Sequence, residues 1–184
     1  MLNDSDKAKL LNLARKTLEE HFVRGSMPDF QTDCPGLLER KGAFVSLHRE
    51  GDLRGCIGQL EPDHKLFKTV QHCTLSAAFS DPRFPPLQQK ELDGLDIEIS
   101  VLTPFRRVEN MEEITVGQHG LYIVRDHFRG LLLPQVAVQY RWDRVTFLEQ
   151  TCYKAGLKES AWKDPQTNIY IFEAEVFSDP KDSA

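Results

Sequence analysis

The chain has 184 residues, of which 40 % are hydrophobic and 28 % charged, and a formal net charge of −5. We therefore expect one globular domain over residues 1–184, with at most a small subdomain formed by connector and loop segments. The acidic balance, without a basic block, argues against nucleic-acid binding. Membrane attachment is not expected, because no apolar run has the length of a spanning helix and Asp4, Asp6 and Lys7 do not fit a signal peptide.

Hydrophobic periodicity predicts the order of helices and strands, because a period of three to four residues is typical of helices and alternation is typical of strands. The predicted elements are a helix at 4–24, an irregular connector at 26–41, strands at 43–48 and 53–60, a helix at 64–79, a strand at 95–103, a helical turn at 110–114, a loop at 116–120, strands at 121–125 and 129–133, a helix at 143–155 and a strand at 168–177. The last residues, 178–184, are expected to form a mobile tail.

Cap and turn residues support these boundaries. Asp4 or Ser5 is the expected cap of the first helix, and Gly25 stands where a helix usually ends. Asp63 and Asp143 are the expected caps of the two later helices. The glycine-containing loop between the first two strands favours an antiparallel hairpin. Since the order lacks regular βαβ alternation, we predict an α+β fold with a mostly antiparallel sheet and flanking helices.

The octet from Leu53 to Leu60 is the most informative stretch, because two glycines bracket a cysteine inside a strand. Glycine in a strand weakens it, and often marks a bulge or the close approach of a ligand or of another backbone. Alternation along the strand predicts that Arg54, Cys56 and Gly58 share one face. A thiol would then lie beside a guanidinium.

Two interpretations of Cys56 stay open. In the first, Cys56 is a nucleophile or a thiol ligand, with Arg54 stabilising the thiolate and His119 acting as base. Glycine backbone amides would stabilise an oxyanion. In the second, Cys56 is a small structural side chain, as unpaired cysteines usually are, and the glycines only let a helix pack against the strand.

Three weaker candidates follow later in the chain. His119 stands between two glycines in a predicted loop, although a lone loop histidine is more often a surface residue. Gln135 interrupts an apolar run, so its amide is either satisfied in the core or faces a ligand. Cys152 lies on the inner face of the last predicted helix, as a core residue or as the wall of a pocket.

Asp81 and Arg83 stand in a proline-rich connection after the second long helix. They form either a preset rim of a site or a helix stop with an internal salt bridge, and the second interpretation is favoured. Glu98 is expected on the solvent face of its strand. Cys73 is expected on the apolar stripe of its helix.

The four cysteines are widely spaced and include no CxxC pair. In a chain of this length that pattern is typical of reduced thiols in the cytoplasm, not of a disulfide framework. No cysteine or histidine pair has local ligand spacing, and no P-loop, HExxH or GxSxG motif is present. The sequence therefore predicts no metal site and leaves the cofactor unknown.

Beyond these patterns, the sequence resembles the AMME-syndrome candidate protein family, whose microbial members are called AmmeMemoRadiSam system protein A. The strongest match is the segment Leu-Arg-Gly-Cys-Ile-Gly at residues 53–58. Further matching segments are 42–45, 78–84, 97–102, 117–121, 132–137, 142–143 and 152–157.

The resemblance implies a single domain of this family with two lobes around a cleft near the octet. It implies an enzyme that acts on a small molecule or carries out a modification, or a component of such an enzyme, beside Memo-like and radical S-adenosylmethionine proteins. The alternative is a non-catalytic binding or adaptor protein for a partner protein or a metabolite. The implied cleft residues are Arg54, Gly55, Cys56 and Gly58, with His119, Gln135 and Cys152 as weaker additions.

Overall fold

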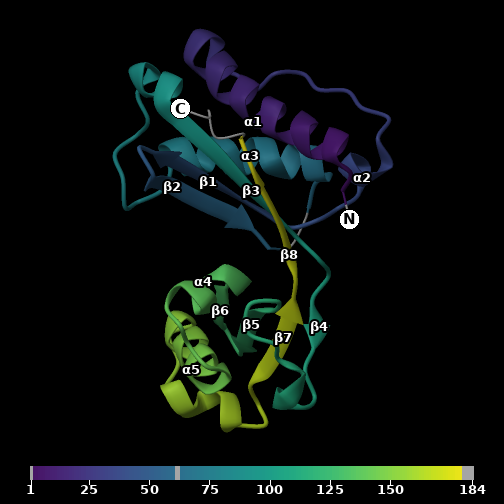
Figure 1. The fold of residues 1–184 in the computed structure, drawn as a ribbon, viewed down its shortest axis with the longest axis vertical. Helices are drawn as coiled ribbons and strands as arrows, with labels where there is room; N and C mark the ends of the chain where they lie inside the picture. The colour runs from purple at the N-terminus through teal and green to yellow at the C-terminus, as the bar shows by residue number, and fades with distance from the viewer. Residues whose placement is uncertain (1, 61–62, 180–184) are drawn as a thin grey trace. The chain divides into compact units, whose positions relative to one another are not determined.

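The structure is a computed structural model that describes residues 2–60 and 63–179, and the chain divides into two compact units (Figure 1). Unit 1 consists of residues 1–102 and 175–184, and unit 2 of residues 103–174. The chain thus passes between the units twice. The strand pairs whose register is described are antiparallel in both units, which confirms the α+β prediction.

Unit 1 is a four-stranded sheet with helices on one face. Its elements are α1 (Asp4–Arg24), α2 (Pro35–Leu38), β1 (Ala43–Arg49), β2 (Asp52–Gln59), α3 (Leu66–Phe79), the 3₁₀ helix η1 (Gln89–Gly94), β3 (Leu95–Leu102) and β8 (Ala174–Ser178). The strand order is β2-β1-β3-β8. Helices α1 and α3 pack against each other and against the sheet.

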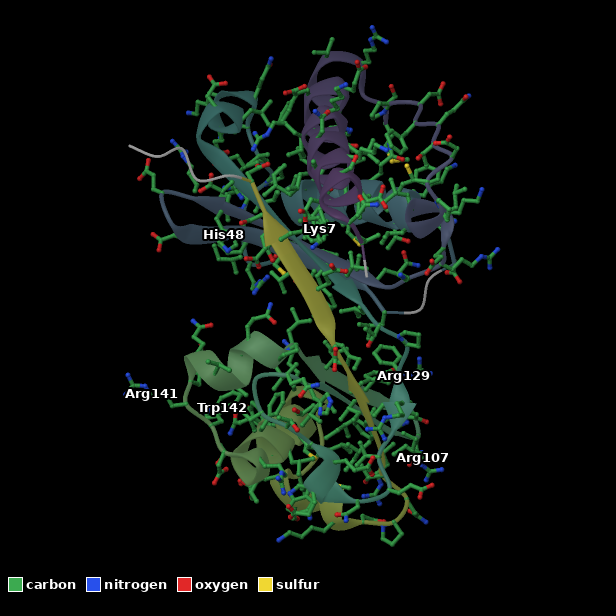
Figure 2. The ribbon with its side chains drawn as sticks, turned by 45° about the vertical axis from the view of Figure 1, so that its right-hand side comes forward. Lys7, His48, Arg107, Arg129, Arg141 and Trp142 are labelled. Atoms are coloured by element: carbon green, nitrogen blue, oxygen red, sulfur yellow. The ribbon has the colours of Figure 1, made fainter. Side chains whose placement is uncertain are left out.

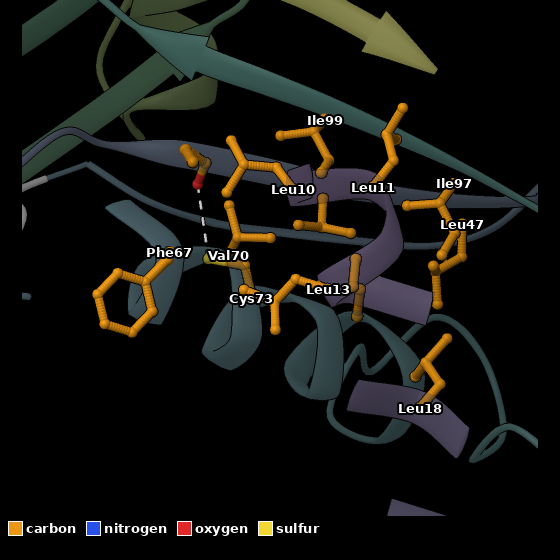
Figure 3. Close-up of a cluster of buried hydrophobic side chains, with 14 of the residues drawn as sticks. Leu10, Leu11, Leu13, Leu18, Leu47, Phe67, Val70, Cys73, Ile97 and Ile99 are labelled. Atoms are coloured by element: carbon orange, nitrogen blue, oxygen red, sulfur yellow. Dashed lines mark hydrogen bonds between the residues drawn. The ribbon is translucent and has the colours of Figure 1, made fainter. Parts of the chain in front are cut away.

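The core of unit 1 follows from the alternation along its strands. Leu47 of β1 and Ile97 and Ile99 of β3 are fully buried toward the helices, and Figure 3 shows them beside leucines of α1. Burial of each such side chain contributes about 2 kcal/mol. Cys73 of α3 lies in the same cluster, 3.5 Å from the carbonyl oxygen of Ala43. Burial raises the pKa of Cys73 to about 12, in agreement with its predicted structural role.

Unit 2 is a second four-stranded sheet packed against α5. Its elements are β4 (Arg106–Arg107), the 3₁₀ helix η2 (Met111–Glu113), β5 (Gly120–Arg125), β6 (Phe128–Leu132), α4 (Pro134–Gln139), α5 (Arg144–Lys154), the 3₁₀ helix η3 (Glu159–Lys163) and β7 (Asn168–Phe172). The strand order is β4-β7-β5-β6. Phe147 and Leu148 of α5 are buried in the core of this unit.

Most predicted boundaries agree with the structure within two residues, but the predicted strand at 168–177 is wrong. It consists of two strands, β7 in one sheet and β8 in the other. They are separated at Glu173, whose N–H donates to Thr103 Oγ1 at 2.8 Å and whose carbonyl accepts from the Thr103 N–H at 2.9 Å. Between β7 and β8, these two hydrogen bonds with Thr103 take the place of hydrogen bonds to a neighbouring strand.

Two predicted helix caps are also wrong. The cap of α1 is Asn3, whose side chain accepts a hydrogen bond from the Asp6 N–H, because the helix already includes Asp4. Helix α3 begins at Leu66 after Lys65, so Asp63 lies too far upstream to cap it. The expected cap Asp143 is confirmed for α5.

The predicted tail begins too early. Ser178 is the last residue of β8. The Asp179 carboxylate accepts a hydrogen bond from the Ile97 N–H at 3.1 Å and pairs with Arg15 at 2.6 Å, so this position is bound to the sheet and to α1. Residues 180–184 of the predicted tail lie outside the described residues.

Gly55 provides a test of this packing, because a Cβ atom built on it would overlap the carbonyl oxygen of Ala77 in α3. We expect Gly55→Ala to lower the free energy of unfolding by about 2 kcal/mol, as overpacking of a core does. Urea denaturation measures the loss. Gly94→Ala is the matched control, since a Cβ atom there meets no atom within 4 Å. Equal losses in both variants would contradict the packing argument.

Candidate functional site

The candidate site lies on the face of the unit 1 sheet that points away from the helices. The pairing of β1 with β2 matches Leu47 with Gly55 and His48 with Leu53. Arg54 is therefore an extra residue, a β-bulge, in β2. The bulge interrupts the alternation on which the common face of Arg54 and Cys56 was predicted.

Beyond the bulge, three polar residues form a row across three neighbouring strands. Cys56 of β2 is paired with Ser46 of β1, and Ser46 is paired with Glu98 of β3. The Ser46 hydroxyl donates to Cys56 Sγ at 3.1 Å. The row therefore combines a half-buried thiol with a hydroxyl and a carboxylate.

Asp81 and Arg83 form hydrogen bonds with the backbone of Cys56 at the open edge of the sheet. Asp81 Oδ2 accepts from the Cys56 N–H at 2.9 Å, and Arg83 Nη2 donates to the Cys56 carbonyl oxygen at 3.2 Å. Because β2 is the edge strand, these two groups would otherwise need water. The structure shows the internal salt bridge, which was the favoured interpretation, and the role of this pair as the rim of a site stays a prediction.

The ion pair of Asp81 with Arg83 is buried at one end and open at the other. The Asp81 side chain is 2 % exposed and the Arg83 side chain 55 %, with 2.7 Å between Oδ2 and Nη2. Hydrogen bonds from the Arg83 guanidinium, and then from the backbone N–H groups of Cys56 and Arg83, hold the pKa of Asp81 well below its ordinary value. Arg83 is therefore an anchored cation with an accessible surface.

Arg54 pairs with a different carboxylate. Its Nε lies 2.9 Å from Glu91 Oε1 and its Nη2 lies 3.2 Å from Glu91 Oε2, with the side chains 14 % and 9 % exposed. This contact, followed by weaker ones that include Arg49, lowers the pKa of Glu91. The guanidinium that contacts Cys56 belongs to Arg83 and reaches its backbone carbonyl oxygen, whereas Arg54 is paired with Glu91 and its role beside the thiol stays a prediction.

The space beside both octet glycines is filled by the chain itself. Gly55 accommodates the backbone of α3 at Ala77, and Gly58 accommodates the ring of Phe44 on the opposite face. This packing agrees with the second interpretation of the glycines. A ligand-binding role for Gly55 and Gly58 stays a prediction.

The three weaker candidates lie in unit 2. His119 Nδ1 accepts from the Thr115 N–H at 3.1 Å, which closes the loop before β5. Gln135 is half-buried in the first turn of α4. Cys152 belongs to α5 and is fully buried in the core of unit 2, and burial raises its pKa. The structure thus assigns Cys152 to the core, while the roles of His119 and Gln135 stay predictions.

Sequence reasoning did not assign Ser46 or Glu98 to the site, although a signal for both existed. Ser46 alternates with the buried Val45 and Leu47, so the predicted hairpin already directed it away from the helices. Glu98 was expected on the solvent face, and its strand position is confirmed. What the sequence lacked was the register that aligns both residues with Cys56.

Two kinds of feature are absent from residues 2–60 and 63–179. No group of three or more histidine, cysteine or acidic side chains stands close enough to hold a metal ion. No helix in this part of the chain combines the length and the apolar character needed to cross a membrane.

Comparison with known proteins identifies relatives over nearly the whole chain. A family model described as AMMECR1 matches residues 11–177. A protein of Methanothermobacter thermautotrophicus is 44 % identical over 187 residues, which cover 96 % of this chain and 95 % of that protein. Protein TK0174 of Thermococcus kodakarensis is 44 % identical and is covered to 88 %. The crystal structure of uncharacterized protein PH0010 from Pyrococcus horikoshii superposes with a TM-score of 0.87 at 40 % identity, covering 93 % of this chain and 90 % of that one.

The buried pair of Arg54 with Glu91 yields a stability prediction. We expect Arg54→Ala to lower the free energy of unfolding by about 3 kcal/mol, because it leaves the Glu91 carboxylate buried without its main partner. Denaturant unfolding measures the change. Arg24→Ala removes an exposed ion pair with Glu20 and should cost about 0.5 kcal/mol or less. A silent Arg54→Ala variant would disprove the assignment of Arg54 to this ion pair.

Asp81 predicts a dependence of stability on pH. Because the pKa of its carboxyl is lowered by folding, the ion pair contributes fully above about pH 4 and is lost as pH falls below that value. We expect Asp81→Asn to cost about 2 kcal/mol at neutral pH, with a smaller difference from the parent protein in acid. Urea midpoints between neutral pH and strong acid test this. The exposed Asp93→Asn should show neither effect, and a constant difference for Asp81→Asn would contradict the argument.

Proposed function

The chain belongs to the AMMECR1 family, and we propose that it is a thiol-dependent member that binds a small anionic molecule at Cys56. Membership confirms the resemblance carried by the octet. The observation that supports the function is the surroundings of Cys56, whose Sγ accepts from Ser46 and whose backbone is joined to the half-exposed cation Arg83. A nucleophilic thiol needs such a donor and cation nearby.

In this proposal, Cys56 Sγ attacks an electrophilic carbon of the bound anion. A sulfur–carbon bond forms, and an electron pair moves to the oxygen of the attacked group, where Arg83 offsets its charge. The thiol proton goes to a base. Glu98 is the candidate base on the same face of the sheet. It lies two strands away from Cys56, because Cys56 is paired with Ser46 and Ser46 is paired with Glu98. His119, the base expected from sequence, belongs to unit 2, and its role as a base stays a prediction.

We further propose the biochemical role and the partner proteins that the family resemblance implies. The chain would act on a small molecule, or serve as one component of a modification system with Memo-like and radical S-adenosylmethionine proteins. The cytoplasm is the expected compartment, since free thiols persist where disulfides are reduced. The implied cleft beside the octet belongs to the same proposal.

The test of the site is the alkylation rate of each cysteine with anionic iodoacetate and with neutral iodoacetamide, followed by peptide mass spectrometry. We expect Cys56 and Cys34, which are half-buried, to react in the native protein and Cys73 and Cys152 to resist. Arg83→Gln should lower the iodoacetate-to-iodoacetamide rate ratio of Cys56 about fivefold, as loss of a neighbouring charge does.

The control is built into the same molecule. Cys34 Sγ accepts from Lys9 Nζ at 2.9 Å, so its rate ratio should be unchanged by Arg83→Gln. An inert Cys56, or a rate ratio that ignores Arg83, would exclude the proposed site. Incubation with a metabolite extract should then yield a covalent adduct that Cys56→Ala abolishes and Cys73→Ala retains.

The alternative function is a non-catalytic binding or adaptor protein, and the exposed apolar surface of unit 2 favours it. Val138 is 58 % exposed and Tyr140 is 61 % exposed, with the Tyr140 ring stacked on Trp142 at 5.0 Å. For this function, Tyr140→Ser should weaken capture of a Memo-like or radical S-adenosylmethionine protein while Cys56→Ser is silent. The opposite pattern would favour the thiol-dependent function.

A further inference from the structure

Unit 2 contains a hollow of about 440 Å³. It lies beside β4, which is the edge strand of the sheet, and the neighbouring strand β7. The residues that line this hollow include Arg107, Val108, Trp162, Lys163, Thr167 and Ile169. This volume is in the range of small-molecule sites. All of its lining residues belong to unit 2, so the hollow is complete within that unit.

Two residues that line this hollow each have a buried polar atom without a hydrogen-bond partner in the described part of the chain. The two atoms are Trp162 Nε1 and Thr167 Oγ1. Thr167 as a residue is 8 % exposed. Nearly all buried polar groups in folded proteins are paired, so two such atoms on residues that line one hollow call for a partner from outside the chain. The indole N–H only donates, and the partner must therefore offer an acceptor.

The charges around the hollow favour an anionic acceptor. Arg107 extends from the edge strand β4 (Figure 2) and is exposed. Lys163 Nζ lies 5.1 Å from the centre of the Trp162 ring. Of the two acidic residues at the hollow, Asp164 is already paired with Arg125 at 3.0 Å, and Glu109 is exposed. Two cations thus accompany the two donors.

We propose that this hollow binds a small oxyanion, the carboxylate or phosphate group of a metabolite. Trp162 Nε1 and Thr167 Oγ1 donate hydrogen bonds to its oxygens, and Arg107 and Lys163 balance its charge. Hydrogen bonds to a charged acceptor are stronger than neutral ones. The buried Val108 and Ile169 form the apolar wall for the carbon skeleton of an organic anion.

The experiment uses Trp162 as reporter in the full-length chain. The sequence has two tryptophans, so Trp142→Phe leaves Trp162 as the sole tryptophan, which is excited selectively at the red edge of the absorption band. Succinate and inorganic phosphate are titrated separately at constant ionic strength, which distinguishes a carboxylate from a phosphate ligand. We expect a saturable change in fluorescence, together with a rise in Tm, for at least one of the two probes.

Matched valine variants separate binding from stability. Thr167→Val should lower the affinity for the probe by about tenfold or more. It should not lower the Tm of the free protein, because the hydroxyl has no hydrogen bond to lose. Thr151→Val is the control, since the Thr151 hydroxyl donates to the Phe147 carbonyl oxygen within α5 at 2.7 Å. That variant should lower the Tm and keep the affinity.

Two results would overturn the proposal. Absence of a saturable response to both probes would mean that the two donors pair with water only. An affinity that is unchanged in both Thr167→Val and Arg107→Gln would place the anion elsewhere. Cys56→Ala should bind the probes with the affinity of the parent protein. The test of this anion site is therefore independent of the test of the thiol site in unit 1.

Discussion

The carboxylate of Asp81 is the group on which the outer face of unit 1 depends. It is buried, and it accepts the N–H of Cys56, the N–H of Arg83 and the guanidinium of Arg83 at once. One side chain therefore pairs the open edge of β2, holds the turn after α3 and fixes a cation beside the octet thiol. Loss of its charge would release all three, since a buried donor without its acceptor is costly.

The two units use their polar groups in different ways. In unit 1 the charged side chains near the octet form ion pairs, Arg54 with Glu91 and Arg83 with Asp81, although Arg54 Nη1 is buried without a hydrogen-bond partner in the described part of the chain. In unit 2 the hollow beside Trp162 has two donors without such compensation in the described part of the chain. A buried ion pair makes the fold sensitive to the loss of either partner, whereas unpaired buried donors indicate a ligand or water. The proposed thiol site in unit 1 and the proposed anion site in unit 2 are therefore separate.

Local pattern was a good guide wherever one face of an element is buried. The periodicity of α1, the alternation of β3 and the hairpin of β5 with β6 were predicted from it, because each pattern reflects a single buried face. The same logic failed at residues 168–177. The alternation continues through Glu173 while the chain leaves one sheet for the other, and only the reciprocal bonds of Glu173 with Thr103 mark the change.

The sequence by itself determined the fold class, the octet as a special strand and the core position of Cys73, because these depend on composition and local period. The family followed from the resemblance of its motif segments, and Cys152 was left as a core residue or the wall of a pocket. Only the tertiary structure decided which groups meet Cys56. A bulge at Arg54, the pairing of Ser46 with Glu98 and the return of Asp81 to the sheet edge are long-range events. No local pattern encodes them, since a shift of one residue in register changes every side-chain neighbour.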